Sequence, residues 1–136
     1  MSKLVEEDLR QPVRDYFKNK NYSVFNEAKL FSRGIDVIAK RRSRVIAIEL
    51  KVQKWRRAIQ QAYMDLRVSN YAFVALPESK WERIDRRIYC DAYNYGIGLL
   101  SVDGDVRQIM RPAPSKRIQP KLRRRFLTNL QKVGQE

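Results

Sequence analysis

The chain of 136 residues contains no histidine, and Cys90 is its only cysteine. The lack of histidine excludes imidazole catalysis and imidazole metal ligands, and a single cysteine excludes an intramolecular disulfide and a thiolate zinc cluster. Any metal must therefore be bound by oxygen ligands. No run of about 18 apolar residues is present to cross a bilayer, and residues 1–8 lack the apolar core of a secretion signal. We therefore expect a cytoplasmic protein without a membrane partner.

Acidic residues are scarce, with 15 Asp and Glu against 29 Lys and Arg, which gives a net charge of +14. The excess is confined to two segments. Residues 40–57 carry eight cations against Glu49, and residues 111–136 carry eight against Glu136, so each segment has a net charge of +7. Two such patches are typical of a surface that binds a polyanion, most commonly nucleic acid. Solvated surface charge and binding of the basic tail to a membrane surface are the alternatives.

The length predicts one domain, and the hydrophobic content of 43% is that of a globular protein. Apolar residues at helical spacing predict a helix from Leu4 to about Lys18, which Pro12 should kink or divide. A strand is expected over residues 22–28. The β-branched segments 35–39 and 45–52 should form an antiparallel hairpin.

The second half of the chain alternates between segments with the apolar spacing of a helix and apolar segments typical of strands. A helix over residues 55–68 and a buried strand over 71–76 predict a crossover that joins two parallel strands. Ser79 and Glu82 resemble a capping box for a helix to about Tyr93. A strand at 98–102, a turn at Asp103-Gly104, a strand at 106–110 and a basic helix near the end of the chain complete the predicted order.

Chemistry is concentrated in the predicted hairpin, where Asp36 is followed by Glu49-Leu50-Lys51. If residues 41–44 form a four-residue loop, Lys40 pairs with Val45 and Asp36 lies opposite Glu49 on the same face. Two facing carboxylates repel unless a cation lies between them, and Mg²⁺ or Mn²⁺ prefers such oxygen ligands. Lys51 would then stabilise charge on a phosphate or help to deprotonate a water. The alternative is an ordinary polar strand face with a cross-strand charge pair.

The strings Gly34-Ile35-Asp36-Val37-Ile38-Ala39 and Ile46-Ala47-Ile48-Glu49-Leu50-Lys51 resemble the motif of the PD-(D/E)XK nuclease superfamily, with Ile35 in place of the proline. The resemblance implies metal binding by Asp36 and Glu49 and catalysis assisted by Lys51. It also implies an α/β, restriction-endonuclease-like fold, in which helices flank a central mixed β-sheet with an α-β-β-β-α-β core and C-terminal additions. Residues 1–110 would form the catalytic domain, and residues 111–136 a basic extension packed on it or following it.

Two further site residues follow from the resemblance, because many members carry a Glu in the first helix and several carry a Gln in the helix after Glu-x-Lys. Glu6 is preferred to Glu7 because it lies three and seven residues before the apolar Leu9 and Val13. Gln61 is preferred to Gln60 because it adjoins the small residues expected to face the sheet. Acidic residues in a first turn also stabilise a helix dipole, so Glu6 has a purely structural alternative.

The sequence therefore predicts a Mg²⁺- or Mn²⁺-dependent DNA endonuclease acting in repair, recombination or restriction of foreign DNA. A nuclease-fold DNA-binding module without catalysis and a basic RNA-binding protein are the competing interpretations. A homodimer is plausible because cutting both strands needs two sites. The cations expected to contact the DNA backbone without reading its sequence are Arg41, Arg42, Arg44, Lys54, Arg56, Arg57, Lys121, Arg123, Arg124 and Arg125.

Overall fold

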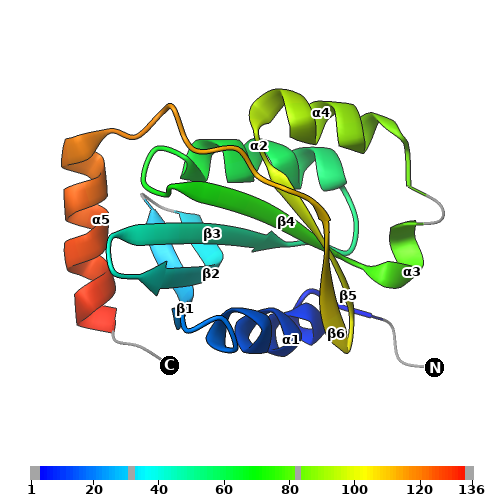
Figure 1. Ribbon diagram of the computed structural model, residues 1–136, viewed down its shortest axis with the longest axis horizontal. Coiled ribbons are helices and arrows are strands. Elements are labelled where there is room, and N and C mark those ends of the chain that lie inside the picture. Colours follow the sequence, from blue (N-terminus) through cyan, green and yellow to red (C-terminus); the bar gives the residue numbers. More distant parts are fainter. Residues whose placement is uncertain (1–3, 31–32, 82–83, 134–136) are drawn as a thin grey trace.

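The computed structural model describes residues 4–30, 33–81 and 84–133 (Figure 1). Six strands form one mixed sheet in the order β1-β2-β3-β4-β5-β6. β1 to β3 are antiparallel neighbours, β3, β4 and β5 run parallel, and β6 returns antiparallel to β5. The strands are β1 (Ser23–Leu30), β2 (Arg33–Arg41), β3 (Arg44–Leu50), β4 (Tyr71–Pro77), β5 (Gly98–Asp103) and β6 (Asp105–Met110).

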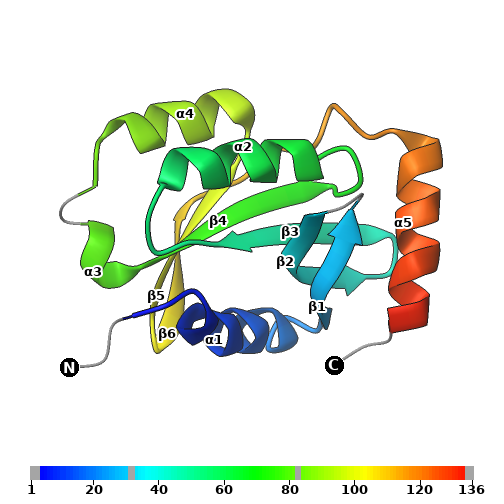
Figure 2. The same cartoon turned by 180° about the vertical axis from the view of Figure 1, so that it is seen from behind.

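Helices cover both faces of this sheet, which confirms the expected α/β class and the mixed sheet flanked by helices. The helices are α1 (Glu7–Lys18), α2 (Trp55–Asp65), α3 (Glu78–Trp81), α4 (Arg87–Tyr95) and α5 (Pro120–Val133). Figures 1 and 2 show α2 and α4 on one face, α1 on the opposite face, and α5 at the end where β2 turns into β3. The β3-α2-β4 unit is the predicted parallel crossover.

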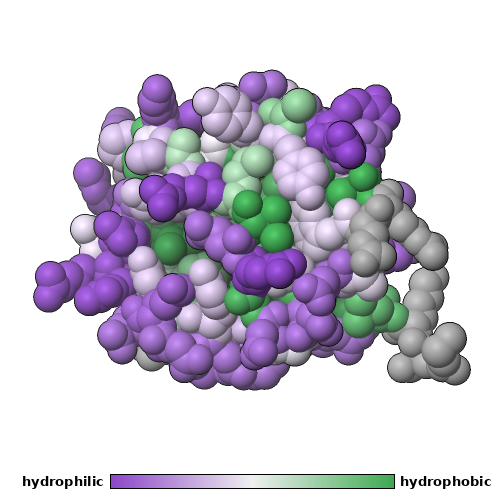
Figure 3. Space-filling view, turned by 45° about the vertical axis from the view of Figure 1, so that its right-hand side comes forward, coloured by the Kyte–Doolittle hydropathy of each residue, from purple (hydrophilic) through white to green (hydrophobic). Residues whose placement is uncertain are grey.

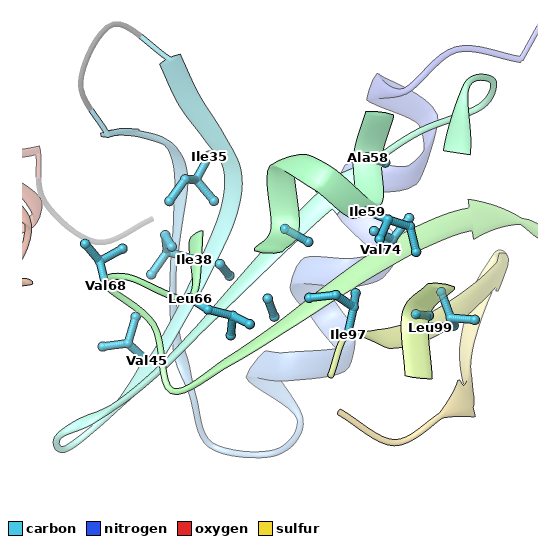
Figure 4. Packing of buried hydrophobic residues seen from close by; sticks show 14 of the residues in the cluster. Ile35, Ile38, Val45, Ala58, Ile59, Leu66, Val68, Val74, Ile97 and Leu99 are labelled. Carbon is cyan, nitrogen blue, oxygen red and sulfur yellow. The ribbon is translucent and has the colours of Figure 1, made fainter. Parts of the chain in front are cut away.

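Alternation along the strands divides the core into two clusters, one under each layer of helices. Ile38, Val45 and Val74 face α2 and α4 in the cluster of Figure 4, together with Ile59 of α2. The other cluster packs alternate strand residues against Leu9, Val13 and Phe17 of α1. Burial of these three side chains explains why α1 continues through Pro12, whose missing N–H removes one helical hydrogen bond.

Several predicted boundaries are wrong. α1 begins at Glu7 and not at Leu4, and α2 ends at Asp65. The expected helix from Ser79 to Tyr93 is two helices, α3 and α4, and α3 begins before Ser79, so Ser79 is not its N-cap; Glu82 lies outside the described residues. The chain leaves α4 through Gly96 in the left-handed conformation, with φ of 72°.

The β2–β3 hairpin has the expected register, with Lys40 paired to Val45, but its turn is tighter than predicted. Arg41 pairs with Arg44, so only Arg42 and Ser43 form the turn. A loop shortened symmetrically from four residues to two adds a rung to the ladder without shifting it, and every side chain stays on its predicted face.

Candidate active site

Asp36 and Glu49 lie next to each other where the pairing of β2 with β3 ends. The last Cα pair of the ladder is Val37 with Ile48, one residue away from each carboxylate. Beyond that pair, the side chain of Asp36 replaces a backbone acceptor: its Oδ2 accepts a hydrogen bond of 2.9 Å from the Leu50 N–H. Glu49 is buried, with an exposed fraction of 2%. The end of the ladder thus holds the Asp36 carboxylate in place beside the buried carboxylate of Glu49.

Burial and the neighbouring carboxylate change the acidity of this pair. The pKa of Asp36 is raised from 3.8 to about 6, first by burial and then by the charge of Glu49 and a hydrogen bond with its side chain. The Leu50 N–H and the Arg10 guanidinium act in the opposite direction and stabilise the carboxylate form. The raising effects dominate, so the site holds negative charge that a cation would stabilise.

Lys51 follows directly after β3 and extends the site toward the start of α1. Its backbone N–H donates to the carbonyl of Ala75 on β4, at 3.0 Å, which holds the residue at the carboxyl edge of the parallel strands. The Lys51 Nζ lies 3.9 Å from Oε1 of Glu6. Glu7, the alternative to Glu6, instead accepts from Arg10 Nε at 3.0 Å. Of the two acids, it is therefore Glu6 that contacts a predicted site residue.

Arg10 is a site component that the sequence reasoning missed. Its side chain is buried, and its Nη1 donates to the backbone carbonyl of Asp36. Arg10 precedes Val13 and Phe17 by three and seven residues, so it lies on the buried side of α1. The sequence did contain a signal for Arg10, because a cation within the apolar stripe of a helix is stable only where it has a buried acceptor or an anion nearby.

Gln61 lies on the half-buried side of α2, beside the fully buried Ala58 and Ala62, whereas Gln60 is exposed. α2 packs over β3 and β4, on the face that also carries Ala47. Because side chains alternate, the odd-numbered residue Glu49 points to the same face as Ala47. This arrangement keeps Gln61, and not Gln60, as the candidate for the site.

The chemistry of the pair fits a hard divalent cation. Asp36 and Glu49 offer adjacent carboxylate oxygens, which Mg²⁺ and Mn²⁺ prefer, and two protein carboxylates leave coordination positions for water and phosphate. Across residues 4–30, 33–81 and 84–133, His, Cys, Asp and Glu do not gather in groups of three or more. Any metal here would thus be bound by the two carboxylates of Asp36 and Glu49, because the carboxylate of Glu6 contacts Lys51.

The two basic segments of the sequence meet in space at the opposite end of β3. Figures 1 and 2 both show α5 beside the β2–β3 turn. The contact is made by Arg123, whose guanidinium donates to the carbonyls of Val68 at 2.8 Å and Ser43 at 2.5 Å. Around this junction, the exposed cations are Arg41, Arg42, Arg44, Lys121, Arg124 and Arg125. Arg123 itself is engaged with the protein backbone, so we leave it out of the candidate DNA surface.

Lys54, Arg56 and Arg57 instead follow the end of β3 that carries Glu49, because α2 begins four residues after Lys51. Lys54 adopts the left-handed conformation with φ of 57°, and all three side chains are exposed. The guanidinium of Arg56 lies 5.1 Å from the ring centre of Trp55. The candidate DNA-binding cations thus form two groups separated by the length of β3, about 20 Å at 3.3 Å per residue.

No helix among the described residues is long and apolar enough to span a membrane. No family model matches the chain, and no curated protein matches it. Among solved structures, it is similar to SPO1766, a protein of unknown function from Silicibacter pomeroyi, with a TM-score of 0.72 and 16% identity over 97% of this chain and 87% of that one. SfsA of Pyrococcus furiosus, solved in complex with Ca²⁺, gives a TM-score of 0.43 and 11% identity over 79% of this chain and 62% of that one. The similarity to SPO1766 shows a shared fold.

Proposed function

We propose that this chain is a metal-dependent DNA endonuclease of the PD-(D/E)XK type that hydrolyses phosphodiester bonds in the cytoplasm. The observation that carries the proposal is the pair of adjacent carboxylates, Asp36 and Glu49, followed at once by Lys51 at the carboxyl edge of the parallel strands. Ligand sites in open α/β sheets favour that edge. Repair, recombination or restriction of foreign DNA remains the proposed context.

In this proposal, Asp36 and Glu49 would hold one Mg²⁺ or Mn²⁺, which would supply Lewis acidity toward the phosphate. The Leu50 N–H keeps the Asp36 carboxylate in place, and Arg10 holds the backbone of the same residue. Lys51 directs its ammonium toward the scissile phosphate, where it stabilises the developing negative charge. Glu6 positions that ammonium through the 3.9 Å contact.

DNA would be held at both ends of β3. Lys54, Arg56 and Arg57 would bind the backbone beside the scissile bond, and the cations of the β2–β3 turn and α5 would bind it farther away. A separation of about 20 Å corresponds to about six nucleotides of one strand at 3.4 Å each. Such contacts fix the position of the DNA without reading its sequence.

The test is cleavage of labelled duplex, single-stranded, flapped and four-way-junction DNA with Mg²⁺ or Mn²⁺, against EDTA. Glu49→Gln removes one anionic ligand without changing side-chain volume, and we expect it to lower cleavage by about a hundredfold or more. Lys51→Ala should abolish cleavage and leave DNA affinity nearly unchanged, since it removes one cation among many. Asp15→Asn, on the exposed side of α1, is the control for loss of an acidic charge. Cleavage that survives in Glu49→Gln would assign the activity to another site or to a contaminant.

If the protein binds DNA but cleaves none of the four substrates with either metal, the noncatalytic DNA-binding alternative is favoured. The junction of α5 with the β2–β3 turn is the observation behind that alternative, because it unites the two basic segments on one surface. Deleting α5 is not a clean test, since Phe126 and Leu130 are buried in the core. Replacing Lys121, Arg124 and Arg125 by Gln should instead reduce the salt slope of binding by about 0.9 for each phosphate that the protein ceases to neutralise.

A further inference from the structure

The segment that joins β6 to α5, residues 111–119, separates two hollows in the protein surface. Three hydrogen bonds hold it against the end of α4 and the loop from α2 to β4: the N–H of Ala113 donates to the Gly96 carbonyl at 3.0 Å, that of Ser115 to Asn70 at 2.8 Å, and that of Gln119 to Arg67 at 2.9 Å. Arg111, Pro112 and Pro114 line both hollows. The two hollows are therefore neighbours on a fixed framework.

The first hollow, which we call the Tyr71 hollow, has a volume of about 480 Å³ and an aromatic floor. Phe17 and Phe73 are buried there, with ring centres 6.0 Å apart. Tyr16, Tyr22 and Tyr71 are half-buried around them. Flat, partly exposed rings at the edge of an apolar floor are suited to stacking against another flat ring.

Cations stand beside these rings. The Arg44 guanidinium lies 5.8 Å from the ring centre of Tyr71, and Lys20 Nζ lies 4.9 Å from that of Tyr16. Arg44 also donates to the Tyr22 hydroxyl at 3.5 Å. Tyr16 and Tyr71 thus each have a cation over the ring, and a base that stacks there would displace the cation toward its own phosphate.

The second hollow, the Tyr95 hollow, has a volume of about 490 Å³ and repeats this combination. Tyr93 and Tyr95 line it with exposed fractions of 78% and 45%, large values for aromatic side chains. Tyr95 packs on Tyr63 with ring centres 4.8 Å apart, and the guanidinium of Arg117 covers Tyr63 at 3.9 Å. Tyr95 is thus supported by a second ring, and both Tyr93 and Tyr95 remain open to solvent.

Charge distinguishes these hollows from the larger one beside α3. Among the described residues, neither the Tyr71 hollow nor the Tyr95 hollow is lined by Asp or Glu, and each is lined by three cations. The hollow beside α3, of about 920 Å³, has a mixed lining in which Asp8, Glu78 and Asp103 stand with Lys80 and Arg107. Figure 3 shows hydrophobic atoms in recesses between hydrophilic side chains on the face that it presents. The aromatic hollows therefore select for an anion that carries flat rings.

We propose that the Tyr71 and Tyr95 hollows form a track for single-stranded nucleic acid, with unpaired bases stacked on tyrosines on either side of Arg111 and phosphates held by the cations between them. Repeated rings with repeated cations match the alternation of bases and phosphates in a strand. A duplex would not fit, because its bases are already stacked on each other. Open hollows that share one wall suit successive nucleotides of a strand.

The track is independent of the proposed nuclease site. Asp36, Glu49 and Lys51 line neither the Tyr71 hollow nor the Tyr95 hollow. Binding to the track needs no metal. Glu49→Gln in EDTA therefore measures it without cleavage, and its result does not depend on whether the protein is a nuclease.

The experiment is fluorescence anisotropy with a 12-nucleotide oligothymidylate, an abasic 12-mer of equal charge, a uridine 12-mer and a duplex of equal length. We expect the thymidine strand to bind about tenfold more tightly than the abasic strand, because stacking depends on the base. Similar affinity for the uridine strand would extend the site to RNA, and weaker affinity would restrict it to DNA; both support the track. Equal affinity for the thymidine and abasic strands would overturn it.

Variants test whether the strand binds in the two hollows. Arg111→Gln removes the exposed cation common to both hollows and should weaken binding of the thymidine strand severalfold more than Arg86→Gln, an exposed cation that lines neither. Tyr93→Ser, at a position that contributes little to folding because it is 78% exposed, removes one stacking ring, and Tyr71→Leu removes another. The double variant should lower the ratio of thymidine to abasic affinity severalfold. If circular dichroism shows that the double variant is folded and its ratio of thymidine to abasic affinity is unchanged, the proposal is contradicted. It is also contradicted if thymidine monophosphate, at concentrations comparable to that of the strand, displaces the strand from the protein.

Discussion

Asp36→Asn gives a direct thermodynamic test of the carboxylate pair. The amide retains an oxygen that can accept from the Leu50 N–H but removes the charge that faces Glu49. Because the folded-state pKa of Asp36 is about 6 and the ordinary value is 3.8, the folded protein binds more protons than the unfolded chain between these two pH values. The free energy of unfolding must therefore fall as the pH rises from about 4 to about 6, and this loss persists above pH 6.

The size of the effect follows from the two pKa values. Two pKa units at 1.36 kcal/mol each set an upper bound of about 3 kcal/mol, and screening by solvent reduces it because Asp36 is only partly buried. We expect Asp36→Asn to be about 1–3 kcal/mol more stable than the unchanged protein at pH 7.5 without metal, and nearly equal to it at pH 4.

The assay is urea denaturation followed by circular dichroism from pH 4 to pH 8 in EDTA, with Asp15→Asn as the control for loss of an exposed acid. A saturating divalent cation should reverse the order at pH 7.5, because a ligand at a hundred times its Kd adds about 2.7 kcal/mol to the folded state that binds it. Parallel pH curves for Asp36→Asn and the unchanged protein, with no stabilisation at pH 7.5, would refute the reasoning that burial, together with Glu49, destabilises the ionised form of Asp36.

Two further predictions concern the framework around the site. Arg123→Gln should lower the free energy of unfolding by about 1–3 kcal/mol, because the carbonyls of Val68 and Ser43 lose a charged donor and the bond to Val68 is partly buried. If Arg123 bound DNA instead, the variant would lose DNA affinity at unchanged stability. Gly98→Ala should cost about 1–3 kcal/mol, because an added Cβ would lie 2.6 Å from the ring of Phe73 and force the core to shift. Both are measured by urea denaturation, and a Gly98→Ala variant of normal stability would show that the ring moves without cost.

Local patterns in the sequence determined most of the fold and the central chemistry. The register of the β2–β3 hairpin follows from strand alternation, so Asp36 and Glu49 were predicted on one face even though the turn between them has two residues and not four. The parallel crossover followed from a helical pattern between two apolar strands. These features join elements that follow one another directly along the chain, so the periodicity of each segment is enough to predict them.

Only the tertiary structure decided which distant residues join them. Arg10 reaches Asp36 from 26 positions away, and Arg123 reaches Ser43 from 80 positions away. No periodic pattern encodes such pairings, because they depend on how α1 and α5 pack against the ends of the sheet. The tyrosine hollows arise in the same way, since a hydrogen-bonded connection folds back between rings contributed by separate helices and strands. The sequence thus specified the carboxylates and the amount of positive charge, and packing specified where that charge and the exposed rings gather.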